Sequence, residues 1–175
     1  MSKILLFFLL ALVSCGNLRS LATFDFDTFY TKLVFLHNAF RRRHSAGELT
    51  KNIYIAKYAQ KTADECKAIG SLKHSGSSIG QNLYVAGGMA PSAGAVIDAW
   101  YSEFQNYDYD KGSSKNGGVI GHFTQLVWKS TTEIGCAVAE GTWNRLTPSY
   151  FICCNYVPEG NLHGQYTRNV LKQNF

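Results

Sequence analysis

The sequence has no apolar run long enough to cross a membrane, few prolines and little charge. A membrane-spanning helix needs about 20 apolar residues, and the longest apolar run, residues 4–13, is much shorter. Only 17% of the 175 residues are charged and 46% are hydrophobic, so the composition is globular rather than disordered. Three prolines beside 16 glycines exclude collagen-like and proline-rich repeats. The length fits one domain.

Standard nucleotide-binding and zinc-protease signatures are also missing. The chain contains no GxGxxG, GxxxxGK[ST] or HExxH segment. Three consecutive arginines, residues 41–43, fall at the end of an expected helix. The helix dipole favours basic side chains at that end, so the run is typical of a solvated helix terminus. Because the formal net charge is only +5, we expect no nucleic-acid partner.

The first residues have the pattern of a secretory signal peptide. Lys3 precedes the apolar run and small residues follow it, so we expect residues 1–15 to be removed by cleavage near Cys15 or Gly16. The protein is then secreted, and its five cysteines become an even four in an oxidising compartment. Residues 12–15 (LVSC) are also similar to a bacterial lipobox; in that alternative Cys15 carries a lipid anchor.

The rest of the chain mixes helical and strand patterns. Apolar side chains recur at helical spacing in three segments, residues 25–43, 53–66 and 92–104. Strand patterns occur in three others, residues 80–85, 133–140 and 149–156. We expect a loop containing Gly141 and Pro148 to join the last two strands, and a flexible surface loop at residues 112–118. Interspersed helices and strands predict an α+β domain in which helices cover a sheet.

Several short motifs follow one another in a family-specific order. Residues 121–128 read GHFTQLVW and residues 152–161 read ICCNYVPEGN. Upstream, residues 37–44 fit HNxxRxxH, residues 59–66 fit AQxxAxxC, and residues 100–103 read WYSE. These motifs resemble the CAP superfamily, also called SCP/TAPS, which includes cysteine-rich secretory proteins, antigen 5 and pathogenesis-related 1 proteins. The resemblance implies a CAP/SCP domain over residues 25–168, folded as a three-layer α-β-α sandwich.

The resemblance also implies a large cleft lined by two histidines and two acidic residues. The histidines match His74 and His122, and one acid matches Glu103, but Gln81 stands where the family has a glutamate. In the family the histidines can hold a divalent cation such as zinc, so His74 and His122 are candidate metal ligands. Gln81 cannot ionise, and two protein ligands alone make a weak, open site. The alternative is that the four residues form only a polar network.

The function implied by the resemblance is extracellular binding or effector activity, and no catalytic residue is assigned. Several family members bind sterols or fatty acids outside the cell, and in some of them an aromatic-rich loop after the WYxE helix carries the sterol contact. Here Phe104, Tyr107 and Tyr109 are the candidate lipid contacts, although Ser114 stands where a third loop aromatic is expected. An extracellular protein is the other candidate partner. We expect a monomer with no required cofactor, and a metal-assisted hydrolase acting on a peptide or ester is the alternative function.

The resemblance further implies a disulfide between Cys136 and Cys154, which the family commonly joins. Cys153 and Cys154 are adjacent in an expected strand, so their side chains point to opposite faces. Parity then leaves Cys153 for Cys66 on the second expected helix, as a second predicted disulfide.

Overall fold

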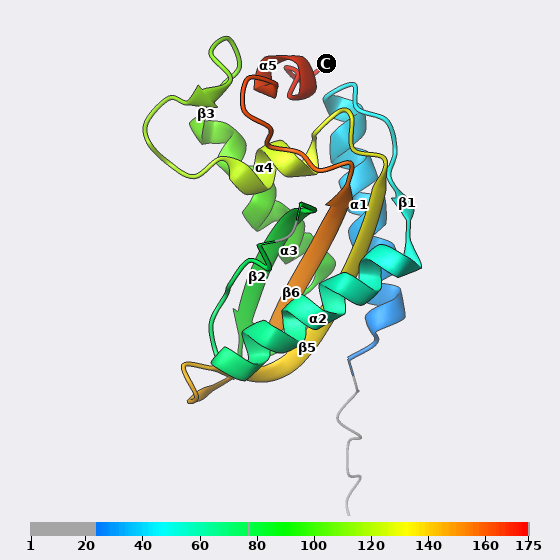
Figure 1. The fold of residues 1–175 in the computed structure, drawn as a ribbon, viewed down its shortest axis with the longest axis vertical. Coiled ribbons are helices and arrows are strands. Elements are labelled where there is room, and N and C mark those ends of the chain that lie inside the picture. Colours follow the sequence, from blue (N-terminus) through cyan, green and yellow to red (C-terminus); the bar gives the residue numbers. More distant parts are fainter. Residues whose placement is uncertain (1–23, 77, 175) are drawn as a thin grey trace, which may run out of the picture.

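The computed structural model describes residues 24–76 and 78–174, and the chain forms helical layers on both faces of a twisted sheet (Figure 1). The predicted signal peptide at residues 1–15, including the lipobox cysteine Cys15, lies outside the described residues. Within the described ranges no helix is long and apolar enough to cross a membrane.

The central sheet of the described chain has four strands in the order β1-β5-β6-β2. Their bounds are β1 Thr50–Lys51, β5 Glu133–Trp143, β6 Thr147–Val157 and β2 Gly80–Gly87. β1 runs parallel to β5, whereas β5, β6 and β2 are antiparallel neighbours. The three predicted strands are therefore present, and each is longer than predicted.

The β5–β6 hairpin turns later than the sequence analysis expects. Gly141 pairs with Ser149 inside the ladder, and Pro148 is also a paired strand residue. The turn lies instead at residues 144–146, where Asn144 and Arg145 adopt positive φ angles of 49° and 62°. Asparagine tolerates this left-handed region well, which explains why the chain reverses there.

The helices form the two outer layers. On one face lie α1 Phe26–Arg43, α3 Ala93–Tyr101 and α4 Gly121–Leu126. α2 Ile53–Ile69 covers the other face. Side-chain caps begin all three predicted helices, because the side chains of Asp25, Asn52 and Ser92 each accept a hydrogen bond from a main-chain amide in the first turn. The result is the α-β-α sandwich that the resemblance predicted.

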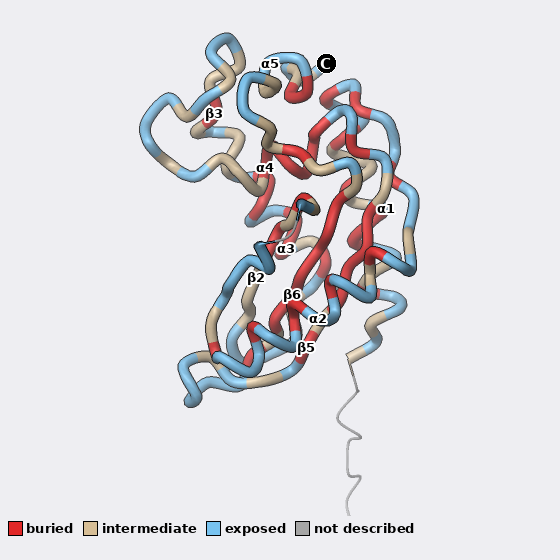
Figure 2. The backbone as a smooth tube through the Cα atoms, viewed as in Figure 1, coloured by how far each residue is buried: buried red, intermediate tan, exposed pale blue. Residues whose placement is uncertain are grey.

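The two interfaces of the sheet differ in side-chain size. The core shared with α1, α3 and α4 is rich in large aromatic rings such as Trp100, Phe123 and Trp128. In Figure 2, long buried stretches run along β6 and through α4. The core under α2 is built largely from alanine and cysteine, with Leu83 and Phe151 as its larger side chains. A Cβ atom on Gly135 would lie 2.2 Å from the Ala56 amide nitrogen, so this close helix–sheet approach requires glycine.

The structure confirms one predicted disulfide and corrects the other. Cys136 and Cys154 are bonded across β5 and β6, with an S–S distance of 2.01 Å. Cys66 and Cys153 are buried free thiols, so the predicted second bridge is wrong for this structure. Burial raises the pKa of the Cys153 thiol and thereby suppresses the thiolate that disulfide formation requires.

The arginine run is also not uniformly solvated. Arg42 and Arg43 are exposed as expected, but Arg41 is fully buried because it continues the inward-facing stripe of α1. Its guanidinium donates hydrogen bonds of 2.7 to 3.1 Å to four main-chain carbonyls, those of Gly47, Leu126, Trp128 and Thr131. Burial lowers the pKa of Arg41 to about 10, which leaves the side chain charged at neutral pH.

Candidate functional site

The four residues predicted to line the cleft form two hydrogen-bonded pairs. His74, in the connection between α2 and β2, contacts Gln81 in β2. His122, at the start of α4, contacts Glu103 in the 3-10 helix η1 (Ser102–Asn106) that continues α3. Both pairs are tied to the beginning of β2, because Asn82, the neighbour of Gln81, donates a hydrogen bond of 3.0 Å to the His122 carbonyl.

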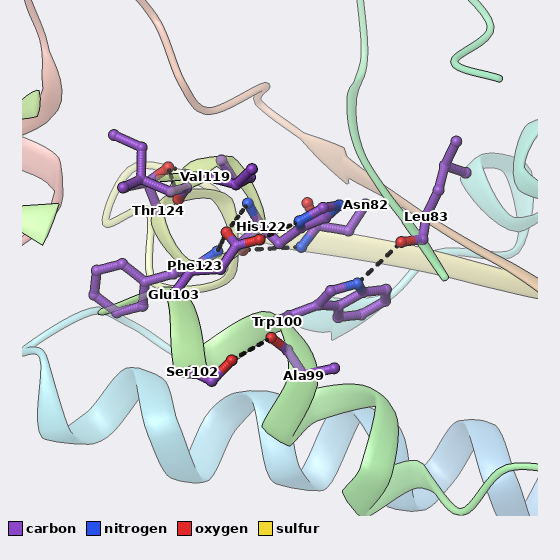
Figure 3. A network of polar contacts seen from close by, with 12 residues as sticks. Asn82, Leu83, Ala99, Trp100, Ser102, Glu103, Val119, His122, Phe123 and Thr124 are labelled. Atoms are coloured by element: carbon purple, nitrogen blue, oxygen red, sulfur yellow. Dashed lines mark hydrogen bonds and ion pairs between the residues drawn. The ribbon is translucent and has the colours of Figure 1, made fainter. Parts of the chain in front are cut away.

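The pair of His122 and Glu103 is rigidly held (Figure 3). Glu103 Oε1 lies 2.6 Å from His122 Nδ1, and Glu103 Oε2 accepts from the main-chain amides of His122 and Phe123 at 2.9 and 3.2 Å. The His122 ring stacks on Trp100 with an interplanar angle of 9°, and the Trp100 indole donates to the Leu83 carbonyl at 3.1 Å. A carboxylate can only accept, so Nδ1 is the donor in this pair, and in the neutral imidazole Nε2 then has the lone pair.

In the pair of His74 and Gln81 the histidine is again the donor, but the acceptor is a neutral amide oxygen. Gln81 Oε1 accepts from the Ser75 amide at 3.2 Å, and a main-chain N–H can only donate, so the atom facing His74 Nδ1 at 2.9 Å is an oxygen. The Gln81 amide nitrogen donates to Asn155 Oδ1 at 2.9 Å and contacts the hydroxyl of Thr62 at 3.4 Å. His74 therefore also donates from Nδ1.

The two histidines share one chemical property. In each, Nδ1 is fixed by a protein acceptor, and no residue of the described ranges hydrogen-bonds to Nε2. Metal-binding histidines are commonly oriented in this way by an outer partner. The described chain contains no group of three or more His, Cys, Asp and Glu side chains placed to hold a metal. A cation on His74 and His122 would therefore need water for its other ligands.

Sequence reasoning missed the residues that fix Gln81. Asn155 lies in the ICCNY motif and points to the same face of β6 as Cys153, so strand alternation was the available signal. Thr62 lies in α2, on the buried face with Ala59 and Cys66. Neither side chain belongs to a recognisable pattern of catalytic or metal-binding residues.

The aromatic residues predicted to contact lipid pack mainly against the protein. Tyr107 is only 2% exposed, and its ring centroid lies 5.8 Å from that of Phe123. Phe104 and Tyr109 are half-buried against the same Phe123 ring, each with a centroid distance of 6.4 Å. These rings stabilise the base of the loop, as aromatic clusters commonly do.

The expected flexible loop at residues 112–118 is tied back onto this aromatic base. β4 Ser113–Ser114 pairs with β3 Tyr107–Asp108, which places Ser114 opposite Tyr107. Between this hairpin and the segment that enters α5 Tyr166–Asn169 lies a cavity of about 420 Å³. It is lined by Lys111, Gly112, Ser113, Ser114, Ile120, His163, Gly164, Tyr166 and Thr167.

The sandwich architecture and the order of its motifs define a known class of protein. Residues 34–156 match the family model of the cysteine-rich secretory protein family, CAP. The chain therefore belongs to the CAP family.

Relatives in fungi and plants agree. The chain is 40% identical to Protein PRY2 of Saccharomyces cerevisiae over 147 residues, covering 82% of this chain and 41% of that protein. It is 40% identical to Secreted protein RBT4 of Candida albicans over 141 residues, covering 78% and 36%. Pathogenesis-related protein 1A of Nicotiana tabacum is 34% identical over 129 residues, covering 74% of each chain. The chain spans about two fifths of the length of these fungal relatives.

Solved structures support the fold. Schistosoma mansoni venom allergen-like protein 4 superposes with a TM-score of 0.61 at 22% identity, covering 83% of this chain and 94% of that one. The protein named MpPR-1i superposes with a TM-score of 0.59 at 21% identity, covering 84% and 98%. At this level of identity the likeness shows the shared architecture.

Proposed function

We propose that this chain is an extracellular binding protein that takes up a small amphipathic lipid, either a sterol or a fatty acid. The cavity beside the β3–β4 hairpin supports the proposal, because its volume of about 420 Å³ falls within the usual range for ligand pockets, about 300–1,000 Å³. Ile120 and Tyr166 supply apolar wall, while Lys111 and Ser114 supply polar groups. An amphipathic ligand needs this combination. The relative named Secreted protein RBT4 and the signal-peptide pattern favour an extracellular location.

The packing of the loop aromatics supports the hairpin beside this cavity. Tyr107 is buried and pairs with Ser114, which lines the cavity. None of the candidate lipid contacts Phe104, Tyr107 and Tyr109 lines the cavity, so the lipid in this proposal contacts the lining residues rather than these rings. Preformed walls of this kind reduce the ordering cost of binding.

Titration of the purified chain with a fluorescent sterol and a fluorescent fatty acid tests the proposal. Thr167→Trp places a large ring in the cavity wall and should weaken binding at least about tenfold, which corresponds to about 1.4 kcal/mol. Thr142→Trp, on the β5–β6 hairpin and outside the cavity lining, is the matched control and should bind as the wild type does. Absence of saturable binding of both probes, or equal affinity of the two variants, contradicts the proposal.

A second candidate function is weak binding of a divalent cation by His74 and His122. The shared hydrogen-bonding pattern of the two histidines supports it, because Nδ1 of each contacts a side-chain oxygen and no described residue hydrogen-bonds to Nε2. A neutral imidazole nitrogen is a suitable ligand for zinc. A cation bound there would supply Lewis-acid chemistry.

The hydrogen-bonded partners of these histidines do not favour the hydrolase alternative. Gln81 cannot accept a proton, and both oxygens of Glu103 already accept hydrogen bonds from His122 or from the start of α4. Calorimetric titration with Zn²⁺, followed by a peptide and ester assay on the same sample, separates the alternatives. Zinc binding without turnover supports the binding function, whereas turnover that requires His122 would establish a hydrolase.

A further inference from the structure

Two hydrogen-bonded routes lead from buried thiols to His74. In the first, Cys66 Sγ accepts from the Lys73 amide at 3.3 Å and contacts the Lys73 carbonyl at 3.4 Å. Lys73 immediately precedes His74, so this route fixes the main chain at the histidine.

The second route fixes the partner of the His74 ring. Cys153 Sγ donates to Asn155 Oδ1 at 3.4 Å, and the same oxygen accepts from the Gln81 amide nitrogen at 2.9 Å. With its nitrogen held by Asn155, Gln81 presents its oxygen to His74 Nδ1. The thiol thus orients the acceptor that selects the tautomer of His74.

His74 itself lies in an exposed connection that has no regular structure over residues 71–76, so it depends on such anchors. Cys66 is 1% exposed and Cys153 is 0% exposed, and both belong to the small-residue core between α2 and the sheet. Buried thiols of this kind behave as inert structural groups. They can therefore act as permanent hydrogen-bonding groups in a secreted protein without being oxidised.

We infer that Cys66 and Cys153 are positioning residues for His74: together they hold its imidazole with Nδ1–H on Gln81 and Nε2 open. The consequence for cation binding rests on the second function proposed above. The position and tautomer of the ring, however, are properties of the metal-free protein and can be measured without any cation.

The test is ¹⁵N NMR of the histidine rings in the metal-free full chain. Cys66→Val and Cys153→Val approximately preserve side-chain volume but remove the hydrogen bonds, whereas Cys66→Ser and Cys153→Ser retain a donor and an acceptor. Each valine variant should reduce the Nδ1–H population of His74, and each serine variant should restore at least half of the loss. The signals of His122 should stay unchanged, because Glu103 holds that ring independently.

Leu83→Ala is the control for a general loosening of this core. Leu83 is buried in the same cluster, and its side chain makes no hydrogen bond; only its main-chain carbonyl accepts one, from Trp100. Leu83→Ala should lower stability while leaving the His74 tautomer as in the wild type. An unchanged tautomer in both valine variants, or an equal change in Leu83→Ala, overturns the inference.

Zinc titration of the same variants keeps the two proposals separate. If the tautomer shifts as expected but the wild type binds no zinc, the positioning role stands and the cation site is rejected. If zinc binds and the tautomer does not respond to either valine substitution, the cation site stands and the positioning role is rejected.

Discussion

Two pairs of histidines in this chain contrast with each other. His37 and His44 lie in the interior with 0% exposure, and both ring nitrogens of each are hydrogen-bonded. His37 contacts the Leu33 carbonyl and the Tyr156 hydroxyl, both at 2.8 Å. His44 contacts the Leu171 carbonyl at 2.6 Å and the Tyr101 hydroxyl at 2.9 Å. No nitrogen is left in these rings to bind anything else.

His74 and His122 each use only one ring nitrogen within the described chain. The residue type is the same as in the interior pair, and His37 and His44 likewise belong to a family motif. The comparison teaches that the number of satisfied ring nitrogens, rather than the presence of a histidine in a motif, separates a structural histidine from a candidate ligand.

The largest expected effect is a loss of stability when a histidine of the interior pair is removed. His37→Ala removes a buried ring and one hydrogen bond of the buried Tyr156 hydroxyl, so we expect the free energy of unfolding to fall by about 3–5 kcal/mol. Urea denaturation measures this loss. His163→Ala, at an exposed position, should change stability by less than about 0.5 kcal/mol. Similar values for the two variants would invalidate the distinction.

The second largest expected effect is a loss of stability in acid that comes from His37 of the interior pair. Burial is the main cause that lowers the pKa of His37, from 6.5 to about 4, and the Arg41 charge adds to it. The unfolded chain therefore binds the proton more readily than the folded chain. The contribution of neutral His37 to the free energy of unfolding is complete above pH 6.5 and is lost as the pH falls toward 4. The loss amounts to about 3 kcal/mol.

Urea denaturation at a series of pH values measures this dependence. His37→Gln cannot titrate and should show a shallower fall in stability between pH 6.5 and 4 than the wild type. Parallel curves for the two proteins would show that His37 does not contribute.

Substitution of the candidate ligands His74 and His122 should have the opposite balance of effects from His37→Ala. We expect a small loss of stability and a large loss of zinc affinity. His74→Ala and His122→Ala each remove an open Nε2, so zinc affinity should fall at least about 100-fold, because loss of an outer partner alone costs about 10- to 100-fold. Unfolding free energy should fall by only about 1 kcal/mol. Calorimetry and urea denaturation on the same samples test both, and retained zinc affinity would exclude the site.

The smallest expected effect sharpens the contrast between Gln81 and Glu103. Gln81→Glu introduces a carboxylate at His74 Nδ1, which makes Nε2 a stronger ligand, so zinc should bind about tenfold more tightly. Gln60→Glu, on α2, adds the same charge where the side chain contacts Asp64 rather than a histidine. It should leave the affinity unchanged; equal gains in both variants would indicate a general charge effect.

Much of the fold was predictable because its elements are long and regular. α1 and α2 have strong apolar periodicity, and β5 and β6 alternate clearly. β1, with two residues, and α4, with six, are too short for a period to be recognised. The burial of Arg41 was predictable in principle, since it follows Leu33 and His37 at intervals of four residues on the inner face of α1.

The site was only partly predictable. Motif order identified His74, Gln81, Glu103 and His122, but their hydrogen-bonding state depends on contacts that no short segment contains. The Gln81 amide orientation is set by Ser75 and by Asn155, 74 residues away from Gln81. Cysteine parity likewise predicted a Cys66–Cys153 bridge, and this prediction was wrong. A count of cysteines contains no information on whether their thiols are buried and unbonded.

The hydrogen bonds of Arg41 also have a consequence for the order in which the chain folds during synthesis. Its acceptor at Thr131 lies 90 residues further along the chain. At about 5–20 residues per second, translation takes about 5–20 s to reach it. For most of that interval only one of the four acceptors of Arg41, the Gly47 carbonyl, has been synthesised. Docking of the first helix must therefore follow synthesis of most of the domain, and a nascent chain that stops before residue 131 cannot complete its N-terminal half.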